Sequence, residues 1–365
     1  MLTRRDFLKI SAIACFSGTV PQLESPQTQG PRRCRPVISG SLWWVSPEQS
    51  GRWGLSGWRK ELDQQQKLGF DLLWLTNAPR LIDDPRFSLR DLLDLCAKRK
   101  VQVMVDTGFN GNWYGVLDLK GELELCAKNI RAIGERFATN PAFYAWYIPH
   151  EIYMCWGAMD DYIQRLYPAL VDACKKAARL PVAVSPFFIL DRTKTFGDFR
   201  FNEPNEYCGY WARLIKKSRL DVIMLQDSGE HFSYVTHEQR RPFFAAMAQA
   251  CRESGIRLWG NVEVAEMECP SLQEYVRRYG RVHPSTVKNI PWRPVPIARL
   301  GEKLALAAEY SEKIVSWGYQ EFCRPDRGAP AAAWYKAYRT YRKQIRARRA
   351  LLFHQARVSL NKVGH

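Results

Sequence analysis

The amino-acid sequence predicts a single (β/α)8 barrel, the TIM barrel of the α/β class. Three observations lead to this fold: eight short apolar runs, amphipathic helical stretches between them, and a length suited to one large domain. The chain has 365 residues, 46% of them hydrophobic, and barrels of this type take about 250 residues. We divide the sequence into a signal segment (1–20), a linker (21–36), the barrel (37–345) and a basic C-terminal helix or tail (346–365).

The eight expected strands are apolar along most of their length. Continuous apolar strands are typical of parallel sheets that are covered on both faces. The spacing between the runs leaves room for a loop, a helix and a return loop each time. The expected strands are residues 37–45, 71–75, 101–105, 143–148, 181–185, 221–225, 256–262 and 313–317.

Helical periodicity marks the stretches between these strands. Trp58, Leu62 and Leu68 share one helical face that stops before Gly69, a residue type that commonly ends helices. Eight consecutive strand–helix units favour a closed barrel over an open sheet. No GxGxxG sequence follows the first strand, which argues against a dinucleotide site. Residues 270–298 form an insertion before the helix that leads to the eighth strand.

The formal net charge is +17, and much of it lies near the C-terminus. Spread along a helix, these side chains are expected to form a solvated basic face; an anionic membrane surface or an anionic polysaccharide is the alternative partner. Nucleic acid is not expected, because no helix-turn-helix, zinc-finger or RNA-binding signature is present. The basic residues are Lys336, Arg339, Arg342, Lys343, Arg346, Arg348, Arg349, Arg357 and Lys362.

Ten cysteines are scattered along the chain without a CxxC pair. Cys96, Cys126, Cys174 and Cys251 fall within amphipathic stretches and are expected to be small core residues, which indicates folding in a reducing compartment. The histidines show no HxH, HxxxH or HExxH spacing. Neither a metal nor another cofactor is therefore predicted, and the GxSxG and P-loop motifs are absent as well.

Residues 3–9, Thr-Arg-Arg-Asp-Phe-Leu-Lys, resemble the twin-arginine export motif. The apolar run from Ile10 to Val20 that follows is too short to span a bilayer. We therefore predict export through the twin-arginine machinery, which transports folded proteins and so agrees with unpaired cysteines. The expected location is the periplasm or beyond. An alternative is a lipid anchor at Cys15, so membrane contact is expected through the N-terminus only.

Aromatic and polar side chains gather where the expected strands end, which is where active sites lie in barrels of this type. Aromatic rings can stack on the apolar faces of sugars while amides and carboxylates bind hydroxyl groups, so this rim is expected to bind carbohydrate. The alternative is a second aromatic core above the barrel. The rim residues are Trp43, Trp44, Asn77, Asp106, Trp113, Tyr114, His150, Tyr153, Trp156, Gln226, Asn261 and Trp317.

Two glutamates follow expected strands that face each other across the barrel mouth. Glycoside hydrolysis uses two carboxyl groups, one to protonate the leaving oxygen and one to attack the anomeric carbon or activate water. Glu151 leaves the fourth strand after apolar residues, as suits a partly desolvated acid. Glu263 shares strand parity with Trp259 and Asn261, so it is expected on their face, and Glu266 is the alternative.

The segments Phe143-Tyr-Ala-Trp-Tyr-Ile-Pro-His-Glu151 and Leu258-Trp-Gly-Asn-Val-Glu263 resemble motifs of an uncharacterised bacterial family grouped with retaining barrel glycosidases. In that group the acid/base follows strand four and the nucleophile lies on strand seven, which implies these roles for Glu151 and Glu263. Trp317 resembles the tryptophan that floors the sugar site there. The typical enzymes have asparagine immediately before the acid/base, and its role is to bind the sugar 2-hydroxyl group. This chain has His150 at that position, so the resemblance does not imply this role for it.

Together these observations predict an exported glycoside hydrolase-like protein that acts on a poly- or oligosaccharide with retention. Two alternatives stay open. A glycan-binding barrel without turnover is supported by His150, and a barrel lyase acting on anionic polymers is supported by the positive charge alone.

Overall fold

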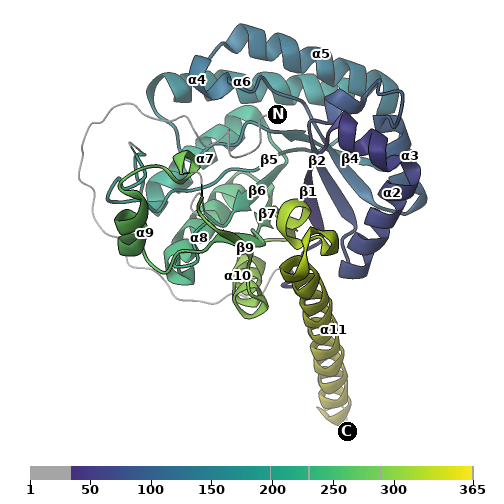
Figure 1. Ribbon diagram of the computed structural model, residues 1–365, viewed down its shortest axis with the longest axis vertical. Helices are drawn as coiled ribbons and strands as arrows, with labels where there is room; N and C mark the ends of the chain where they lie inside the picture. Colours follow the sequence, from purple (N-terminus) through teal and green to yellow (C-terminus); the bar gives the residue numbers. More distant parts are fainter. Residues whose placement is uncertain (1–33, 198, 229–230, 288, 364–365) are drawn as a thin grey trace.

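The computed structural model describes residues 34–197, 199–228, 231–287 and 289–363 and shows a closed barrel of eight parallel strands (Figure 1). The hydrogen-bonded order runs β1-β2-β3-β4-β5-β6-β7-β10 and returns to β1. The predicted fold class and all eight predicted strands are confirmed. The strands are β1 (Gly40–Trp44), β2 (Leu72–Thr76), β3 (Gln102–Asp106), β4 (Phe143–Ile148), β5 (Val182–Val184), β6 (Val222–Gln226), β7 (Arg257–Asn261) and β10 (Lys313–Ser316).

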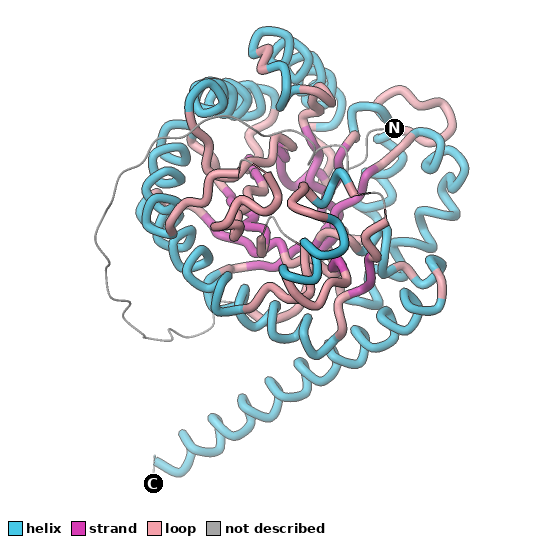
Figure 2. Tube along the Cα trace, turned by 60° about the vertical axis from the view of Figure 1, so that its left-hand side comes forward, coloured by secondary structure: helices cyan, strands magenta, loops and turns pink. Residues whose placement is uncertain are grey.

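Helices surround the strands, as Figure 2 shows from a second direction. Their ends follow local sequence: Gly69 closes the first of them with φ 82°, a conformation that favours glycine. Ser88 and Asp91 form a reciprocal capping box at another helix start. The helices are α2 (Pro47–Leu68), α3 (Leu89–Lys98), α4 (Trp113–Val116), α5 (Leu119–Phe137), α6 (Gly157–Ala177), α7 (Pro204–Ser218), α8 (His237–Glu253), α9 (Leu272–Tyr279), α10 (Ile297–Tyr310) and α11 (Ala329–Val363).

The last helix, α11, covers the barrel with its first turns and then extends away from it in both ribbon views (Figures 1 and 2). Tyr338 is buried, and its hydroxyl accepts a hydrogen bond of 2.7 Å from the backbone N–H of Ile38. Tyr341 donates to the carbonyl of Pro36 at 2.8 Å. The helix continues without a break past the predicted domain end at residue 345.

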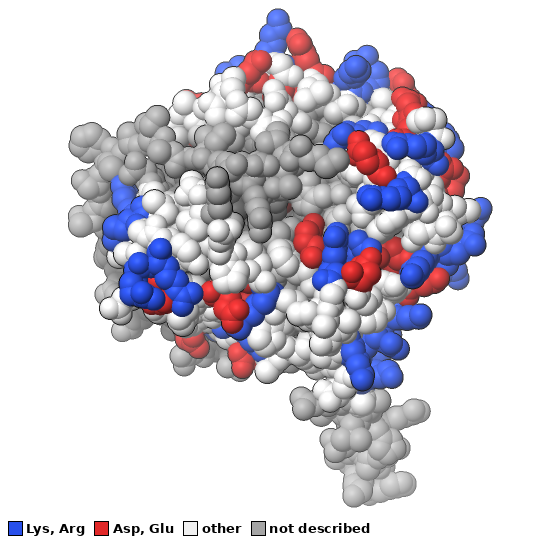
Figure 3. Space-filling view, viewed as in Figure 1, with Lys and Arg blue, Asp and Glu red and all other residues white. Residues whose placement is uncertain are grey.

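Acidic and basic side chains lie next to one another over much of the face drawn in Figure 3. Within the described ranges, no helix is both long enough and apolar enough to cross a membrane. The predicted signal segment and the first part of the linker, up to residue 33, lie outside the residues that the structure describes.

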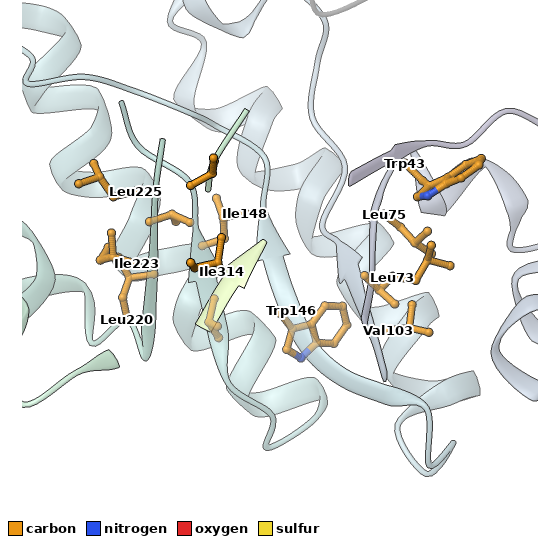
Figure 4. Close-up of a cluster of buried hydrophobic side chains, with 14 of the residues drawn as sticks. Trp43, Leu73, Leu75, Val103, Trp146, Ile148, Leu220, Ile223, Leu225 and Ile314 are labelled. Carbon is orange, nitrogen blue, oxygen red and sulfur yellow. The ribbon is translucent and has the colours of Figure 1, made fainter. Parts of the chain in front are cut away.

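Two apolar layers hold the barrel together. Inside it, side chains such as Leu42, Trp74 and Tyr147 fill the space between the strands. Outside, the strand residues that face the helices pack with the apolar sides of those helices, and Figure 4 shows Trp43 in this outer layer beside Leu75. Alternate residues of one strand therefore belong to different layers. The four cysteines predicted as core residues, Cys96, Cys126, Cys174 and Cys251, are buried, and none of them forms a disulfide bond within the described residues.

The predicted insertion, residues 270–298, contains structure of its own. It holds α9 and the strand β9 (Trp292–Pro294), and β9 pairs antiparallel with β8 (Ala265–Met267), which lies just before the insertion. A small aromatic core that includes Phe232 and Tyr275 supports this subdomain. It stands at the carboxyl end of β7 and therefore borders the mouth of the barrel.

Candidate active site

Glu151 and Glu263 lie just beyond the carboxyl ends of β4 and β7, which are three strands apart in the ring of eight. Both carboxylates are almost fully buried, with 6% and 1% of the residues exposed. Gln226, at the end of β6, links the two sides of the mouth: it contacts Glu151 and is in register with Asn261, two residues before Glu263. The barrel thus brings both predicted carboxylates to the same end.

Each carboxylate oxygen of Glu151 accepts a hydrogen bond. The Tyr147 hydroxyl donates to Oε1 at 2.5 Å, and Gln226 Nε2 donates to Oε2 at 2.9 Å. Tyr147 comes from the interior face of β4, where its ring meets Trp74 edge-on at 4.9 Å. Gln226 Nε2 also donates to the Ser185 carbonyl at 2.8 Å. These two neutral donors therefore fix the position of the Glu151 carboxylate.

A short polar chain continues from Gln226 across the mouth. Asn261 Nδ2 donates to Ser185 Oγ at 3.0 Å, and Ser185 Oγ donates to the Met224 carbonyl at 2.8 Å. These residues come from the ends of β5, β6 and β7, so neighbouring strand ends share one network. Because all of them are buried, the network holds the strand ends in place and is not itself open to solvent.

Glu263 contacts a histidine. Nδ1 of His231 lies against Glu263 Oε2. The His231 ring lies 5.4 Å from the Trp317 ring and 5.6 Å from the Trp292 ring, centroid to centroid. The two tryptophans hold the imidazole plane, and the imidazole in turn orients the carboxylate.

A buried ion pair supports Glu263 from behind. Lys303, from α10, donates to the Glu263 carbonyl at 2.8 Å and approaches Asp227 Oδ2 to 2.9 Å. Burial raises the pKa of Asp227, but the charges of Lys303 and Arg240 outweigh this and hold the pKa below its usual value. Burial lowers the pKa of Lys303. This pair fixes the backbone that carries Glu263.

Several predicted aromatic residues do stand at the mouth. Trp44 is half-buried and belongs to the interior cluster together with Trp317, and its backbone is held by Gln320 at 2.8 Å. Further out, Tyr153 packs on Trp156 with ring centroids 6.1 Å apart. Tyr114 is half-buried against this second cluster, which is separate from the interior one. These residues form an aromatic wall over the ends of β3, β4 and β5.

Two tryptophans that the sequence places at the rim are core residues instead. Trp43 is fully buried among the helices and packs on Trp58 at 5.3 Å, because it points outward where Leu42 and Trp44 point inward. Trp113 stacks on Tyr162 of α6 at 6.1 Å and is 2% exposed. Neither ring faces the mouth, so the prediction that they stack on sugar rings is wrong for both.

His150 is also turned away from the mouth. Its ring is fully buried, and Nε2 lies 2.7 Å from Glu122 Oε1. Together with Cys126 these residues are a group of metal-ligand types, with donor atoms within 4.8 Å of one another. The Cys126 thiol, however, donates to the Gly108 carbonyl at 3.2 Å, so the group is held by hydrogen bonds within the protein. A sugar contact by His150 is therefore a wrong prediction.

Asp106 is fully buried and organises the neighbouring loop. Its carboxylate accepts from the backbone N–H groups of Ala78 at 2.8 Å and Asn77 at 3.1 Å. Burial raises its pKa to about 7, although these bonds oppose the shift. Asn77 itself is half-buried with φ 67°, so only Asn77 of this pair stays near the surface of the rim.

The alternative nucleophile, Glu266, is excluded by its surroundings. Its side chain is 3% exposed and forms ion pairs of 2.9 Å with both Arg293 and Arg299. It lies on β8, in the small antiparallel sheet outside the barrel. These contacts assign Glu266 to the support of the insertion.

Sequence reasoning missed three residues of the site. Tyr147 has a recoverable signal, since it precedes Glu151 by four residues in a strand whose alternate residues face inward. His231 follows the sixth strand, but nothing in the sequence indicates its contact with Glu263. Lys303 lies within an amphipathic helix, and nothing in the local pattern separates it from a solvated lysine.

Comparison with known proteins adds a family and a fold. A family model described as "Domain of unknown function (DUF4434)" matches residues 38–333, and no curated protein matches the chain in sequence. Among solved structures, a proposed alpha-L-fucosidase from Bacteroides thetaiotaomicron is similar with a TM-score of 0.64 and 20% identity, over 89% of this chain and 98% of the other.

Two further structures are more distant. A GH99 endo-alpha-mannosidase from the same organism has a TM-score of 0.50 and 11% identity over 86% of this chain and 98% of its own. An endo-beta-1,4-mannanase from Thermotoga petrophila also has a TM-score of 0.50, with 13% identity over 86% of this chain and 78% of its own. At these identities the similarity establishes the barrel fold.

Proposed function

The chain belongs to the DUF4434 family, whose description names no activity, and we propose that it is a glycoside hydrolase that acts on a poly- or oligosaccharide through Glu151 and Glu263. One observation carries the proposal: two buried carboxylates lie at the same end of the barrel, Glu151 held by the Tyr147 hydroxyl and the Gln226 amide, and Glu263 in contact with His231. Trp44 and Trp317, in the interior cluster at the end of their strands, would supply surfaces for sugar rings. The glycosidase names of the similar structures agree with it.

The two carboxylates would act in two steps. In the first, Glu151 gives its proton to the glycosidic oxygen while Glu263 attacks the anomeric carbon and forms a glycosyl ester. In the second, Glu151 takes a proton from water, the water oxygen bonds to the anomeric carbon, and Glu263 leaves as carboxylate. Tyr147 and Gln226 keep Glu151 in position through both steps, and His231 orients Glu263.

A library of soluble glycans tests the activity directly. Hydrolysis of at least one member by the wild-type protein, lost in Glu263→Gln, supports the proposal. Glu268→Gln is the matched control, because Glu268 is exposed and pairs with Arg293 outside the mouth. Equal activity in Glu263→Gln and the control would contradict a role for Glu263.

A glycan-binding barrel without turnover is the second candidate. One observation favours it: the residue before Glu151 is His150, which is turned into the core, so this position offers no amide to a sugar hydroxyl group. Measurable binding of a glycan, with no hydrolysis of any library member, would decide for this candidate.

We further propose that residues 1–20 direct export through the twin-arginine machinery. The support is the Arg4-Arg5 pair followed by the apolar run up to Val20. Export would bring the barrel to polysaccharides outside the cytoplasm.

A further inference from the structure

A second hollow lies outside the barrel mouth. It is a cavity of about 620 Å³ between the loop after β5, the start of α8 and the start of α9. The start of α7 also lines it, and α7, α8 and α9 lie together on the left of Figure 1. Neither Glu151 nor Glu263 lines this cavity, and its volume falls within the range of about 300–1,000 Å³ that is typical of small-ligand pockets.

The cavity has aromatic walls at two depths. Phe196 and Phe243 are buried and form its floor, whereas Phe201 and Tyr234 are half-buried at its sides. Tyr234 stacks on Phe232 with 5.1 Å between ring centroids and an angle of 15°. This stack holds the Tyr234 ring rigid, as a platform for a flat apolar ligand face requires.

The polar residues around the cavity give it a negative charge. Asp191, Glu203 and Glu238 line it, against one basic residue, Arg192. Arg192 already pairs with Glu203, at 2.6 and 3.1 Å, and covers the Phe201 ring at 3.8 Å. An anionic ligand would meet unbalanced negative charge here, in spite of the net charge of +17 on the whole chain.

One loop joins this cavity to the candidate active site. His231, which contacts Glu263, and Tyr234, which lines the cavity, are three residues apart in the segment after β6. Phe232 lies between them in sequence and packs against Phe196 of the cavity floor at 5.3 Å. A ligand bound in the cavity would therefore lie along the same rim as the catalytic mouth.

We propose that this cavity is a second sugar-binding site, one that takes an uncharged pyranose unit of the polysaccharide substrate. The choice of ligand class rests on the proposed function, whereas the position and the charge preference rest on the cavity itself. Aromatic walls suit the C–H faces of a sugar ring, and the exposed side chains of Glu238 and Gln239 can bind its hydroxyl groups. The site would hold a polymer chain beside the mouth and would add little for a single small glycoside.

The test is affinity electrophoresis of Glu263→Gln protein, chosen to prevent hydrolysis, in gels containing soluble mannan, soluble xylan or polygalacturonate. Tyr234→Ala and Phe201→Ala, each added to this background, should weaken binding of a neutral polysaccharide about tenfold, by analogy with stacking on nucleic-acid bases. Tyr144→Ala is the matched control, since this half-buried ring lies at the opposite end of the barrel, on Trp259. Thermal melts exclude unfolding as the cause.

The outcomes separate this inference from the proposed function. Loss of neutral-polysaccharide binding in both cavity variants supports the second site, even if the wild-type protein hydrolyses nothing. Unchanged binding in both variants, stronger retention by polygalacturonate, or no retention of the parent in either neutral gel would overturn it. Hydrolysis that depends on Glu263 would still support the proposed function in those cases.

Discussion

At the scale of single residues, the contact between His231 and Glu263 is the most informative feature of the site. A carboxylate that attacks a carbon atom must point one oxygen at it, and an imidazole on the other oxygen fixes that direction. Glu263 is the acidic residue that the His231 ring contacts. Its own plane is fixed by Trp292 and Trp317.

Replacement of His231 should therefore lower the rate more than the affinity. We expect His231→Ala to reduce kcat about 10- to 100-fold, the range seen when a supporting hydrogen bond to a site residue is lost. KM should change little, because the histidine is behind the carboxylate. Steady-state kinetics on an active substrate measure both values. His237→Ala is the control, since this histidine pairs with Glu302 at the start of α8, and an equal loss there would contradict the assigned role.

The pH dependence of stability tests the burial of Asp106. Its pKa is raised from 3.8 to about 7 in the folded protein, so between these values the folded state holds more protons than the unfolded state. The free energy of unfolding contributed by this group therefore falls as pH rises from about 4 to about 7 and is constant above that. Asp106→Asn should remove this slope. Urea unfolding at several pH values measures it, and an unchanged slope would contradict the assignment.

At the scale of elements, the loops after β3 and β4 place one tryptophan in the core and another at the rim. Trp113 stacks on Tyr162 beneath the loop, whereas Trp156 is half-buried, with Arg200 over its ring at 4.6 Å. Trp113 therefore stabilises the core and Trp156 belongs to the rim, although each follows a strand in the sequence.

Alanine substitutions should separate these two tasks. Trp113→Ala should cost about 3–5 kcal/mol of stability, as is usual for a buried aromatic residue. Trp156→Ala should cost less stability and should weaken glycan binding, because the ring remains near solvent. Denaturant unfolding and binding to a glycan identified in the library screen measure the two effects. The opposite pattern would place Trp113 at the site and Trp156 in the core.

The same elements show how far sequence reasoning reaches. Strands could be predicted because eight apolar runs mark them, and Glu151 and Glu263 because each follows such a run. Side-chain direction at strand ends was harder: Trp43 and Trp44 are neighbours, and only the register of β1 decides which of them enters the barrel. His150 and Lys303 depend on partners from elements distant in sequence, Glu122 on α5 and Asp227 after β6, and no local pattern reveals these contacts.

At the scale of the whole molecule, the net positive charge does not identify the charge of the ligand. Acidic and basic groups are mixed over the face in Figure 3, and the second cavity is lined by more acidic than basic residues. The overall charge of +17 is therefore a poor guide to the charge of the ligand. The alternative hypothesis of a lyase that acts on anionic polymers was based on the net charge alone, and these surfaces do not support it.

Export can be tested with the intact chain. Replacing Arg4 and Arg5 together with lysine should retain the protein in the cytoplasm of its host, because the paired arginines are the feature that the twin-arginine machinery reads. Cell fractionation followed by immunoblotting measures the distribution. Unchanged delivery of the double variant outside the cytoplasm would remove this prediction.

The central claim is that Glu151 and Glu263 have different chemical roles, and one kinetic comparison tests it most directly. With an activated aryl glycoside, whose leaving group needs no proton, Glu151→Gln should still form the glycosyl-enzyme but should hydrolyse it slowly. Azide should then accelerate turnover and give a glycosyl azide, because a small anion needs no general base. Glu263→Gln should be inactive with and without azide. Equal losses in both variants, with no azide effect in Glu151→Gln, would contradict the account.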